Sequence, residues 1–226
     1  MNSTTQQFDF AGHTATVIVP EKPNGKWIWK TEFLHAFDAA EQALLDRGYT
    51  RVYYEVSDRY GSFGAIRLMH RFHLELLKRY PLRREAILFG FSRGGLYAFN
   101  YAITYPEYVD KVYLDAPVLN LRSWPHDGSP EQAQLLREYH LDTNTLKTFC
   151  GSPKDRLGEY FSLNIPTLLI AGEKDTTVPY PENGKIMAEY AEVHKYPLTV
   201  ITKPDCDHHP HSLTDVTPIV DFVEGN

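Results

Sequence analysis

Short apolar runs alternate with longer amphipathic stretches along most of the chain, and the spacing within each predicts its structure. Apolar runs rich in β-branched, aliphatic and aromatic residues predict buried strands at 14–20, 51–56, 86–89, 111–114, 167–171 and 198–201. Stretches with helical spacing predict helices at 63–80, 96–105 and 217–223. This alternation predicts an α/β fold, in which a mostly parallel, doubly wound sheet carries helices on both faces.

Residues 21–30 contain proline and glycine and predict a loop between the first strand and a helix. Thr31 can cap this helix, and Gly48 is a natural stop after it. Its apolar face would consist of Phe33, Leu34, Phe37, Ala40 and Leu44.

The regular pattern breaks between residues 120 and 164, where prolines and glycines interrupt it repeatedly. We expect short helices and turns in this segment, which would form a small lid inserted over the edge of the sheet. A chain of 226 residues has the size of one domain. The sequence therefore predicts a single domain over residues 1–226 with a lid at 120–164.

The segment Gly90-Phe91-Ser92-Arg93-Gly94 lies between a predicted strand and a predicted helix. In this setting the motif forms a nucleophile elbow, a turn so sharp that side chains at the glycine positions would collide with neighbouring backbone. Ser92 would present its hydroxyl above the sheet, and the N–H of Arg93 would point at the oxyanion. The alternative interpretation is an ordinary flexible connection, since glycine and serine are common. The flanking strand and helix favour the elbow.

A serine hydroxyl needs a general base and a group that orients this base. In such folds the acid and then the histidine follow the serine along the chain. Asp175 follows the strand 167–171 and is the predicted acid, and its rival Asp115 also follows a strand. His208 follows the last strand and is the predicted base, favoured by its position over His209.

The loop that carries these histidines also raises a metal-site hypothesis. Its possible ligands are Cys206, Asp207, His208, His209 and His211. Residues adjacent in sequence do not easily converge on one ion, and no HxxxH or CxxC spacing supports a site. The prediction is therefore a reaction that needs no metal and no organic cofactor.

The order of these motifs resembles the α/β-hydrolase superfamily over nearly the whole chain, and within it the compact bacterial esterase-like hydrolases. The resemblance rests on the GxSxG motif, Asp115-Ala116-Pro117 after a strand, the segment 172–179, and His208-His209-Pro210. It implies a triad of Ser92, His208 and Asp175, with Arg93 in the oxyanion hole.

Two positions depart from the pattern of that family. Val19-Pro20-Glu21 stands where such enzymes carry His-Gly, so the second oxyanion donor would come from the loop 21–29. Asp207 stands where glycine commonly precedes the histidine.

Charge and composition argue against two classes of partner, nucleic acids and membranes. A net charge of −6 without a basic cluster argues against nucleic-acid binding. No apolar run approaches the ~20 residues that cross a bilayer, and the start of the chain lacks a signal-peptide pattern. We expect a cytoplasmic protein with Cys150 and Cys206 as free thiols.

These features predict hydrolysis of a small-molecule ester through an acyl-enzyme. The alternatives are a peptidase, a lactone or C–C bond hydrolase of the same fold, or a non-catalytic binding protein. Polar and charged residues fill 120–140, namely Arg122, His126, Asp127, Glu131 and Arg137. A lipase lid needs a broad apolar face instead, so we expect short acyl esters of polar alcohols, with acetylated carbohydrates as the leading class.

Two further expectations concern side chains near the elbow. Trp27, Trp29 and Trp124 would lie in the oxyanion loop and the lid, where aromatic rings suit sugars or flat acyl groups, or would simply pack the lid onto the body. Arg93 and Asp115 would meet at one sheet edge and form a salt bridge that braces the elbow. The alternative for Arg93 is to bind an anionic group of the substrate.

Overall fold

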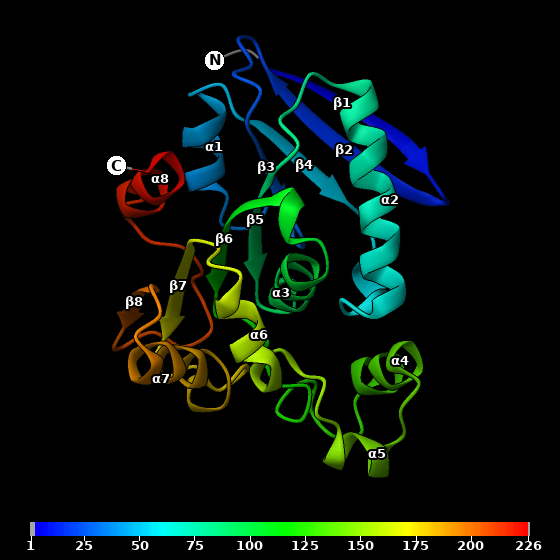
Figure 1. Ribbon diagram of the computed structural model, residues 1–226, viewed down its shortest axis with the longest axis vertical. Helices are drawn as coiled ribbons and strands as arrows, with labels where there is room; N and C mark the ends of the chain where they lie inside the picture. Colours follow the sequence, from blue (N-terminus) through cyan, green and yellow to red (C-terminus); the bar gives the residue numbers. More distant parts are fainter. Residues whose placement is uncertain (1–2, 226) are drawn as a thin grey trace.

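The computed structural model describes residues 3–225. Their strands form one eight-stranded sheet in the order β1-β2-β4-β3-β5-β6-β7-β8 (Figure 1). The strands are β1 Ser3–Phe10, β2 His13–Pro20, β3 Trp27–Lys30, β4 Thr50–Tyr54, β5 Ala86–Phe91, β6 Val109–Asp115, β7 Thr167–Gly172 and β8 Thr199–Lys203. The first two strands pair antiparallel with each other, and β2 is antiparallel to β4. All remaining pairs are parallel, so the predicted mostly parallel α/β sheet is confirmed.

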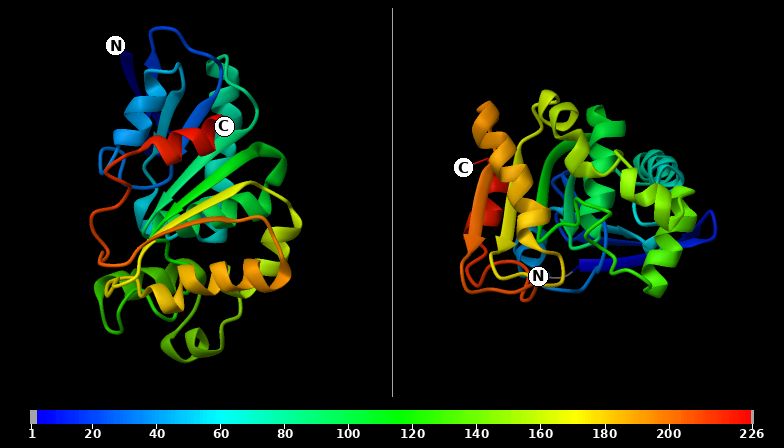
Figure 2. Two further views of the ribbon diagram at one scale, coloured as in Figure 1. Left: turned by 90° about the vertical axis from the view of Figure 1, so that its left-hand side faces the viewer. Right: turned by 90° about the horizontal axis from the view of Figure 1, so that it is seen from below.

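Helices cover both faces of this sheet (Figure 2). They are α1 Ala39–Leu45, α2 Phe63–Arg79, α3 Gly94–Thr104, α4 Pro130–Tyr139, α5 Thr143–Thr148, α6 Leu157–Ser162, α7 Gly184–His194 and α8 Thr217–Glu224. Helices α1 and α8 lie side by side and bury their apolar residues in one core cluster. Helices α2, α3, α6 and α7 contribute to the other, larger cluster.

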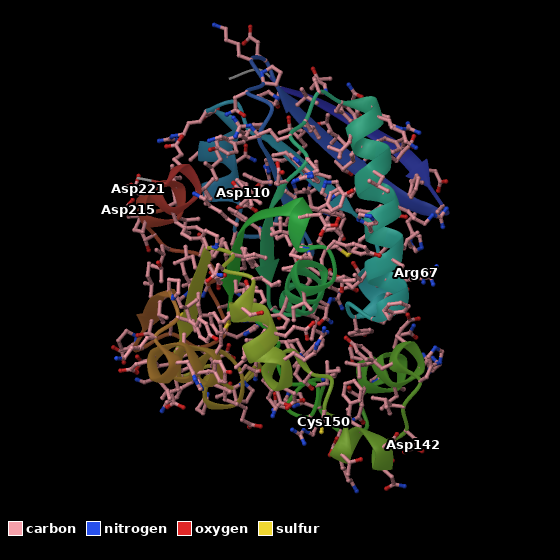
Figure 3. The ribbon with its side chains drawn as sticks, viewed as in Figure 1. Arg67, Asp110, Asp142, Cys150, Asp215 and Asp221 are labelled. Carbon is pink, nitrogen blue, oxygen red and sulfur yellow. The ribbon has the colours of Figure 1, made fainter. Side chains whose placement is uncertain are left out.

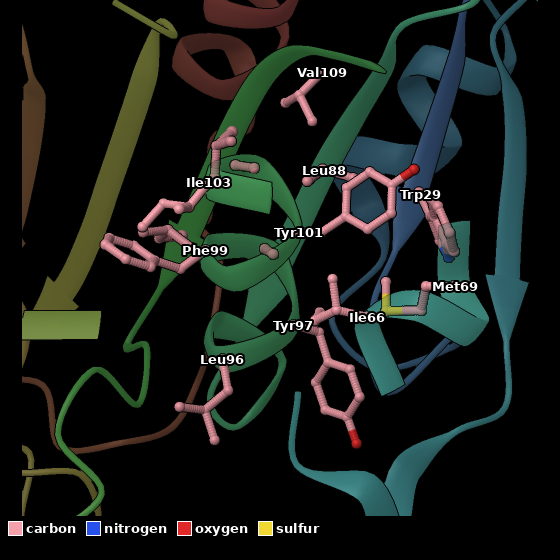
Figure 4. Packing of buried hydrophobic residues seen from close by; sticks show 14 of the residues in the cluster. Trp29, Ile66, Met69, Leu88, Leu96, Tyr97, Phe99, Tyr101, Ile103 and Val109 are labelled. Atoms are coloured by element: carbon pink, nitrogen blue, oxygen red, sulfur yellow. The ribbon is translucent and has the colours of Figure 1, made fainter. Parts of the chain in front are cut away.

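The central strand β5 is buried on both faces. Leu88 faces the larger core, whereas Ile87 and Phe89 face the core of α1 and α8. Successive side chains of a strand point to opposite faces, so a continuous apolar run suits a strand covered by helices on both sides. Figure 4 shows Leu88 among the side chains of α2 and α3. Burying each large apolar side chain stabilises the fold by about 1.5–3 kcal/mol, and this burial fixes the point where Ser92 leaves the sheet.

The predicted loop at 21–30 was wrong for its last four residues, which form β3. Trp27 and Trp29 are fully buried there, with stacked rings 5.7 Å apart. The indole N–H of Trp27 donates to the carbonyl oxygen of Arg83 at 2.9 Å. These two tryptophans therefore cannot contact a substrate.

The predicted helix from Thr31 begins only at Ala39. Phe33 and Phe37 have φ angles of 58° and 51°, in the left-handed region that a right-handed helix excludes. Residues 31–38 form turns instead, and both phenylalanine side chains are partly exposed.

Residues 120–164 contain α4, α5 and α6, as short helices separated by turns. Helix α6 packs against α3, where the rings of Tyr160 and Phe99 stack 4.4 Å apart. Helices α4 and α5 lie together at one end of the molecule (Figure 1). That this segment acts as a lid stays a prediction. Within residues 3–225, no helix combines the length and the apolar character needed to span a membrane.

Candidate functional site

Ser92 occupies a sharp turn between β5 and α3. Its φ of 50° lies in the left-handed region, which costs a non-glycine residue of the order of 1–3 kcal/mol. The turn is held by hydrogen bonds: the Ser92 N–H donates to the Asp115 carbonyl at 2.9 Å, and the Ser92 carbonyl accepts from Gly95 and Val118. A strained backbone kept by its surroundings is typical of functional sites.

The two glycines of the motif allow the backbone to approach closely on both sides of Ser92. A Cβ on Gly90 would lie 2.8 Å from the Cβ of Ala98, on the first half of α3. A Cβ on Gly94 would lie 2.9 Å from the Oγ1 of Thr31. Side chains at either position would push α3 away from the sheet or from the segment after β3, so the sequence-based argument for the elbow has a direct steric basis.

His208 lies beside Ser92 and links it to Asp175. The Nε2 of His208 accepts a hydrogen bond from the Ser92 Oγ at 3.0 Å. The Nδ1–H of the same ring donates to the Asp175 Oδ2 at 2.7 Å. The three residues follow β5, β8 and β7, at the carboxyl ends of parallel strands, and all three are buried.

Asp175 is held in place by its backbone surroundings. Its Oδ1 accepts from the N–H of Thr177 at 3.0 Å and of Val178 at 2.8 Å. With one oxygen fixed by the chain and the other bound to the imidazole, the carboxylate keeps the ring of His208 in one orientation.

Asp207 joins the loops that carry these two side chains. Its Oδ1 accepts from the N–H groups of Thr176 and of His208, at 2.8 and 2.7 Å. These hydrogen bonds lower the pKa of Asp207. The residue that departs from the family pattern therefore connects the loop after β8 to the loop after β7.

Asp115, the rival acid, binds His211 and not His208. Its carboxylate is fully buried and accepts from Tyr113 Oη at 2.5 Å, from His211 Nδ1 at 2.8 Å and from the Ser212 N–H at 2.8 Å. Burial alone would raise the pKa of Asp115, but the hydrogen bond from His211 holds it below the usual range. His209 has no place in the hydrogen bonds between Ser92 and Asp175.

The predicted Arg93–Asp115 salt bridge was wrong. Arg93 pairs with Glu32, with Nη2 and Oε2 3.4 Å apart. Asp115 is two residues after Tyr113, whose ring lies in the core of α1 and α8, so both side chains leave the same face of β6. Arg93 immediately precedes α3, whose apolar side chains lie in the other core, so the sheet separates the two charges.

Glu32 is a site residue that the sequence did not reveal, because a helix was expected from Thr31 where the structure has turns after β3. Its side chain is buried, and it also accepts from the Ser57 Oγ at 3.0 Å. Burial raises the pKa of Glu32, although the charge of Arg93 acts against this. The Arg93 guanidinium lies over the rings of Phe33 and Tyr60, 5.2 and 6.0 Å from their centroids. A charged and aromatic group therefore adjoins the serine.

Comparison with known proteins gives the same picture of the fold. Residues 57–150 match a family model described as the alpha/beta hydrolase fold. The crystal structure of TT1662 from Thermus thermophilus is similar, with a TM-score of 0.67 and 19% identity over 100% of this chain and 98% of that chain. Acylaminoacyl peptidase from Pyrococcus horikoshii has a TM-score of 0.66 and 15% identity over 92% of this chain and 37% of that chain. No curated protein matches the sequence.

Proposed function

We propose that this chain, whose residues 57–150 match a model of the alpha/beta hydrolase fold, is a serine hydrolase of short acyl esters of polar alcohols. Ser92 is the nucleophile, His208 the general base and Asp175 the acid of its triad. One observation carries the proposal: the buried hydrogen bonds from Asp175 to His208 and from His208 to Ser92, at 2.7 and 3.0 Å.

In the first step the Ser92 Oγ attacks the ester carbonyl carbon, and His208 Nε2 takes the hydroxyl proton. The 3.0 Å between these atoms is within direct proton-transfer distance. Asp175 keeps the tautomer whose Nε2 is free to accept, and its charge stabilises the imidazolium that forms. His208 then gives the proton to the leaving alcohol, and the acyl group stays on Ser92.

In the second step water attacks the acyl-enzyme while His208 removes its proton, and the acid product leaves. The oxyanion of both steps would be bound by the N–H of Arg93 and by an N–H of Glu32 or Phe33, which follow β3. These residues replace the loop 21–29 expected from the sequence, because residues 27–29 lie within β3. The Cβ of Glu32 lies 3.2 Å from the Cβ position of Gly94, which supports this pairing of segments. Removal of one such donor costs about 10²–10³ in rate.

A fluorophosphonate probe tests the nucleophile directly. We expect one covalent adduct on the folded protein, measured by intact-mass spectrometry and mapped to Ser92. Ser92→Ala should abolish labelling, whereas Ser162→Ala, which alters an exposed serine of α6, should label normally. A folded protein without an adduct, or an adduct that survives Ser92→Ala, would show that the assignment is wrong.

The reaction class needs a substrate screen, because the fold serves many chemistries. Acetylated sugars and other short acyl esters are the leading substrates. Peptides form a second arm, since one similar structure is named an acylaminoacyl peptidase. Lactones and substrates with a cleavable C–C bond form the third. Absence of both turnover and labelling would favour a non-catalytic binding protein.

A further inference from the structure

Three histidine side chains converge beside Ser92, although they come from one short loop. The ring centroids of His208, His209 and His211 are 4.9, 4.8 and 4.9 Å apart. One ligand nitrogen of each lies within 4.8 Å of the others. Neighbouring residues do converge here, because the chain bends at His208 and at Pro210. We propose that these three rings bind one divalent transition-metal ion, which takes His208 away from Ser92.

Two of the rings are already oriented as metal ligands usually are. The Nδ1–H of His208 donates to Asp175, and the Nδ1–H of His211 donates to Asp115. A metal-binding histidine almost always donates its other ring N–H to a carboxylate or carbonyl oxygen, which fixes the tautomer and raises the basicity of the free nitrogen. The Nε2 atoms of both rings therefore carry the lone pairs that a metal requires.

The third ligand, His209, can move to bring the three nitrogens to metal-binding distance. Nitrogens bound to one tetrahedral zinc ion lie about 3.4 Å apart, since each zinc–nitrogen bond is about 2.0–2.1 Å long. His209 is exposed, whereas His208 and His211 are buried, so His209 is the ring that can move inward. Three imidazoles suit Zn²⁺, Cu²⁺ or Ni²⁺ and leave the fourth position for water.

The charges around the cluster favour a dication. The carboxylates of Asp175 and Asp115 lie directly behind two of the rings. Asp207 adds a third negative charge on the backbone N–H of His208. Lys203 opposes them with one positive charge, and its Nζ is bound to the carbonyl oxygens of Pro210 and Ser212. Three carboxylates against one ammonium leave a net attraction for a cation.

The functional consequence rests on the proposed serine hydrolase. The Nε2 of His208 has one lone pair, which can accept the Ser92 proton or bind the metal. An occupied site leaves Ser92 without its base, so the metal acts as a reversible inhibitor of the nucleophile. Chelation would restore the hydrogen bond and the reactivity.

Binding is tested with Zn²⁺ alone, without reference to activity. The background is Cys150→Ser/Cys206→Ser, because thiols bind zinc themselves; Cys150 is exposed near α5 (Figure 3). In this background the Ser92→Ala variant should bind one zinc ion per chain, as measured by competition with a chromophoric indicator. Adding His209→Gln should weaken binding by at least about 10- to 100-fold, as loss of a supporting partner alone can do. His126→Gln, an exposed histidine outside the cluster, is the matched control and should leave binding unchanged.

Inhibition is tested by the rate of fluorophosphonate labelling in the background that keeps Ser92. Zn²⁺ should slow labelling and EDTA should restore it, and His209→Gln should shift the effect to higher zinc concentration by the same factor as binding. If Ser92→Ala binds zinc but the protein that keeps Ser92 is never labelled, the proposed function is wrong and the metal site still holds. Labelling that zinc does not slow, or binding that His209→Gln does not weaken, would overturn the metal site.

Discussion

At the scale of single residues, the two buried aspartates near Ser92 differ in what they bind. Asp175 receives one hydrogen bond from His208 and two from the backbone. Asp115 binds His211 and Tyr113, and the ring of Tyr113 lies in the core of α1 and α8. Only the first carboxylate can orient the ring that contacts Ser92, so substitutions at the two positions should have different effects.

Asp175→Asn should lower kcat for ester hydrolysis by a factor on the order of 10⁴, because an amide favours the wrong imidazole tautomer. Steady-state kinetics with a chromogenic acetate ester measures this, and the rate of fluorophosphonate labelling should fall as well. Asp115→Asn is the comparison, and it should act mainly on the free energy of unfolding. Nearly normal kinetics in Asp175→Asn together with an inactive but folded Asp115→Asn would reverse the assignment.

Positions of single side chains were predictable only where the chain order fixes them. Ser92, Asp175 and His208 each follow a strand of a parallel sheet, and such strands end at one edge. The partner of Arg93 was not predictable this way, because it depends on which face each side chain leaves. A shift of one residue in a strand reverses that face, and the apolar run of β6 does not reveal it.

At the scale of elements, strands with continuous apolar runs were predictable and short or polar strands were not. β5 and β7 are buried throughout and contain no charged residue. β3 has only four residues and ends in Lys30, which is buried against Glu41. β1 is a mostly exposed polar strand whose pairing with β2 supplies its order. In both missed strands tertiary pairing outweighs local pattern.

The packing of α2 on β3 depends on a neutral histidine. His73 is fully buried between Trp29 and Tyr101. Its Nδ1 accepts from the Tyr101 hydroxyl at 2.7 Å, and its Nε2–H donates to the Arg84 carbonyl at 2.7 Å. Burial lowers the pKa of His73 to about 4, although the hydrogen bond to Arg84 acts against this.

His73 should therefore make the protein less stable in mild acid. Its unfolded-state pKa is near 6.5, so only the unfolded chain gains this proton as the pH falls from 6.5 to 4. The stability is complete above pH 6.5, and its loss amounts to roughly 3 kcal/mol once the pH is below both values. Urea unfolding at several pH values measures it. His73→Gln should lose less stability on acidification than the unsubstituted protein, and an unchanged pH slope in this variant would contradict the account.

At the scale of the whole molecule, a charged pair adjoins the serine where a lipase would offer only apolar surface. The Glu32–Arg93 pair adjoins the elbow, and the ring of Tyr60 lies between Arg93 and Trp124. The segment 120–140 contains further charged side chains, and its helix α4 contacts residues 57–59, next to Tyr60. A long acyl chain would have to remove water from these charges without replacing their hydrogen bonds.

We therefore expect kcat/KM for p-nitrophenyl acetate to exceed that for p-nitrophenyl decanoate by more than tenfold, a free-energy difference of about 1.4 kcal/mol or more. Both esters share one leaving group, so the comparison isolates the acyl side. Ser92→Ala corrects for background hydrolysis. A preference for decanoate would reject the short-acyl assignment while leaving the nucleophile untouched.

The nucleophile Ser92 and the base His208 follow strands that differ in local stability. Ser92 follows β5, which has neighbours on both sides, whereas His208 follows β8, an edge strand of the sheet that residues 3–225 form, paired only with β7. Edge elements with partly exposed side chains open more readily than the core. On warming, we expect β8 to open locally and to move His208 away from Ser92 while the turn at Ser92 keeps its structure. Inactivation should then begin several degrees below the loss of the far-ultraviolet circular dichroism signal, and it should reverse on brief cooling. If the two curves coincide, β8 is as stable as the central strands.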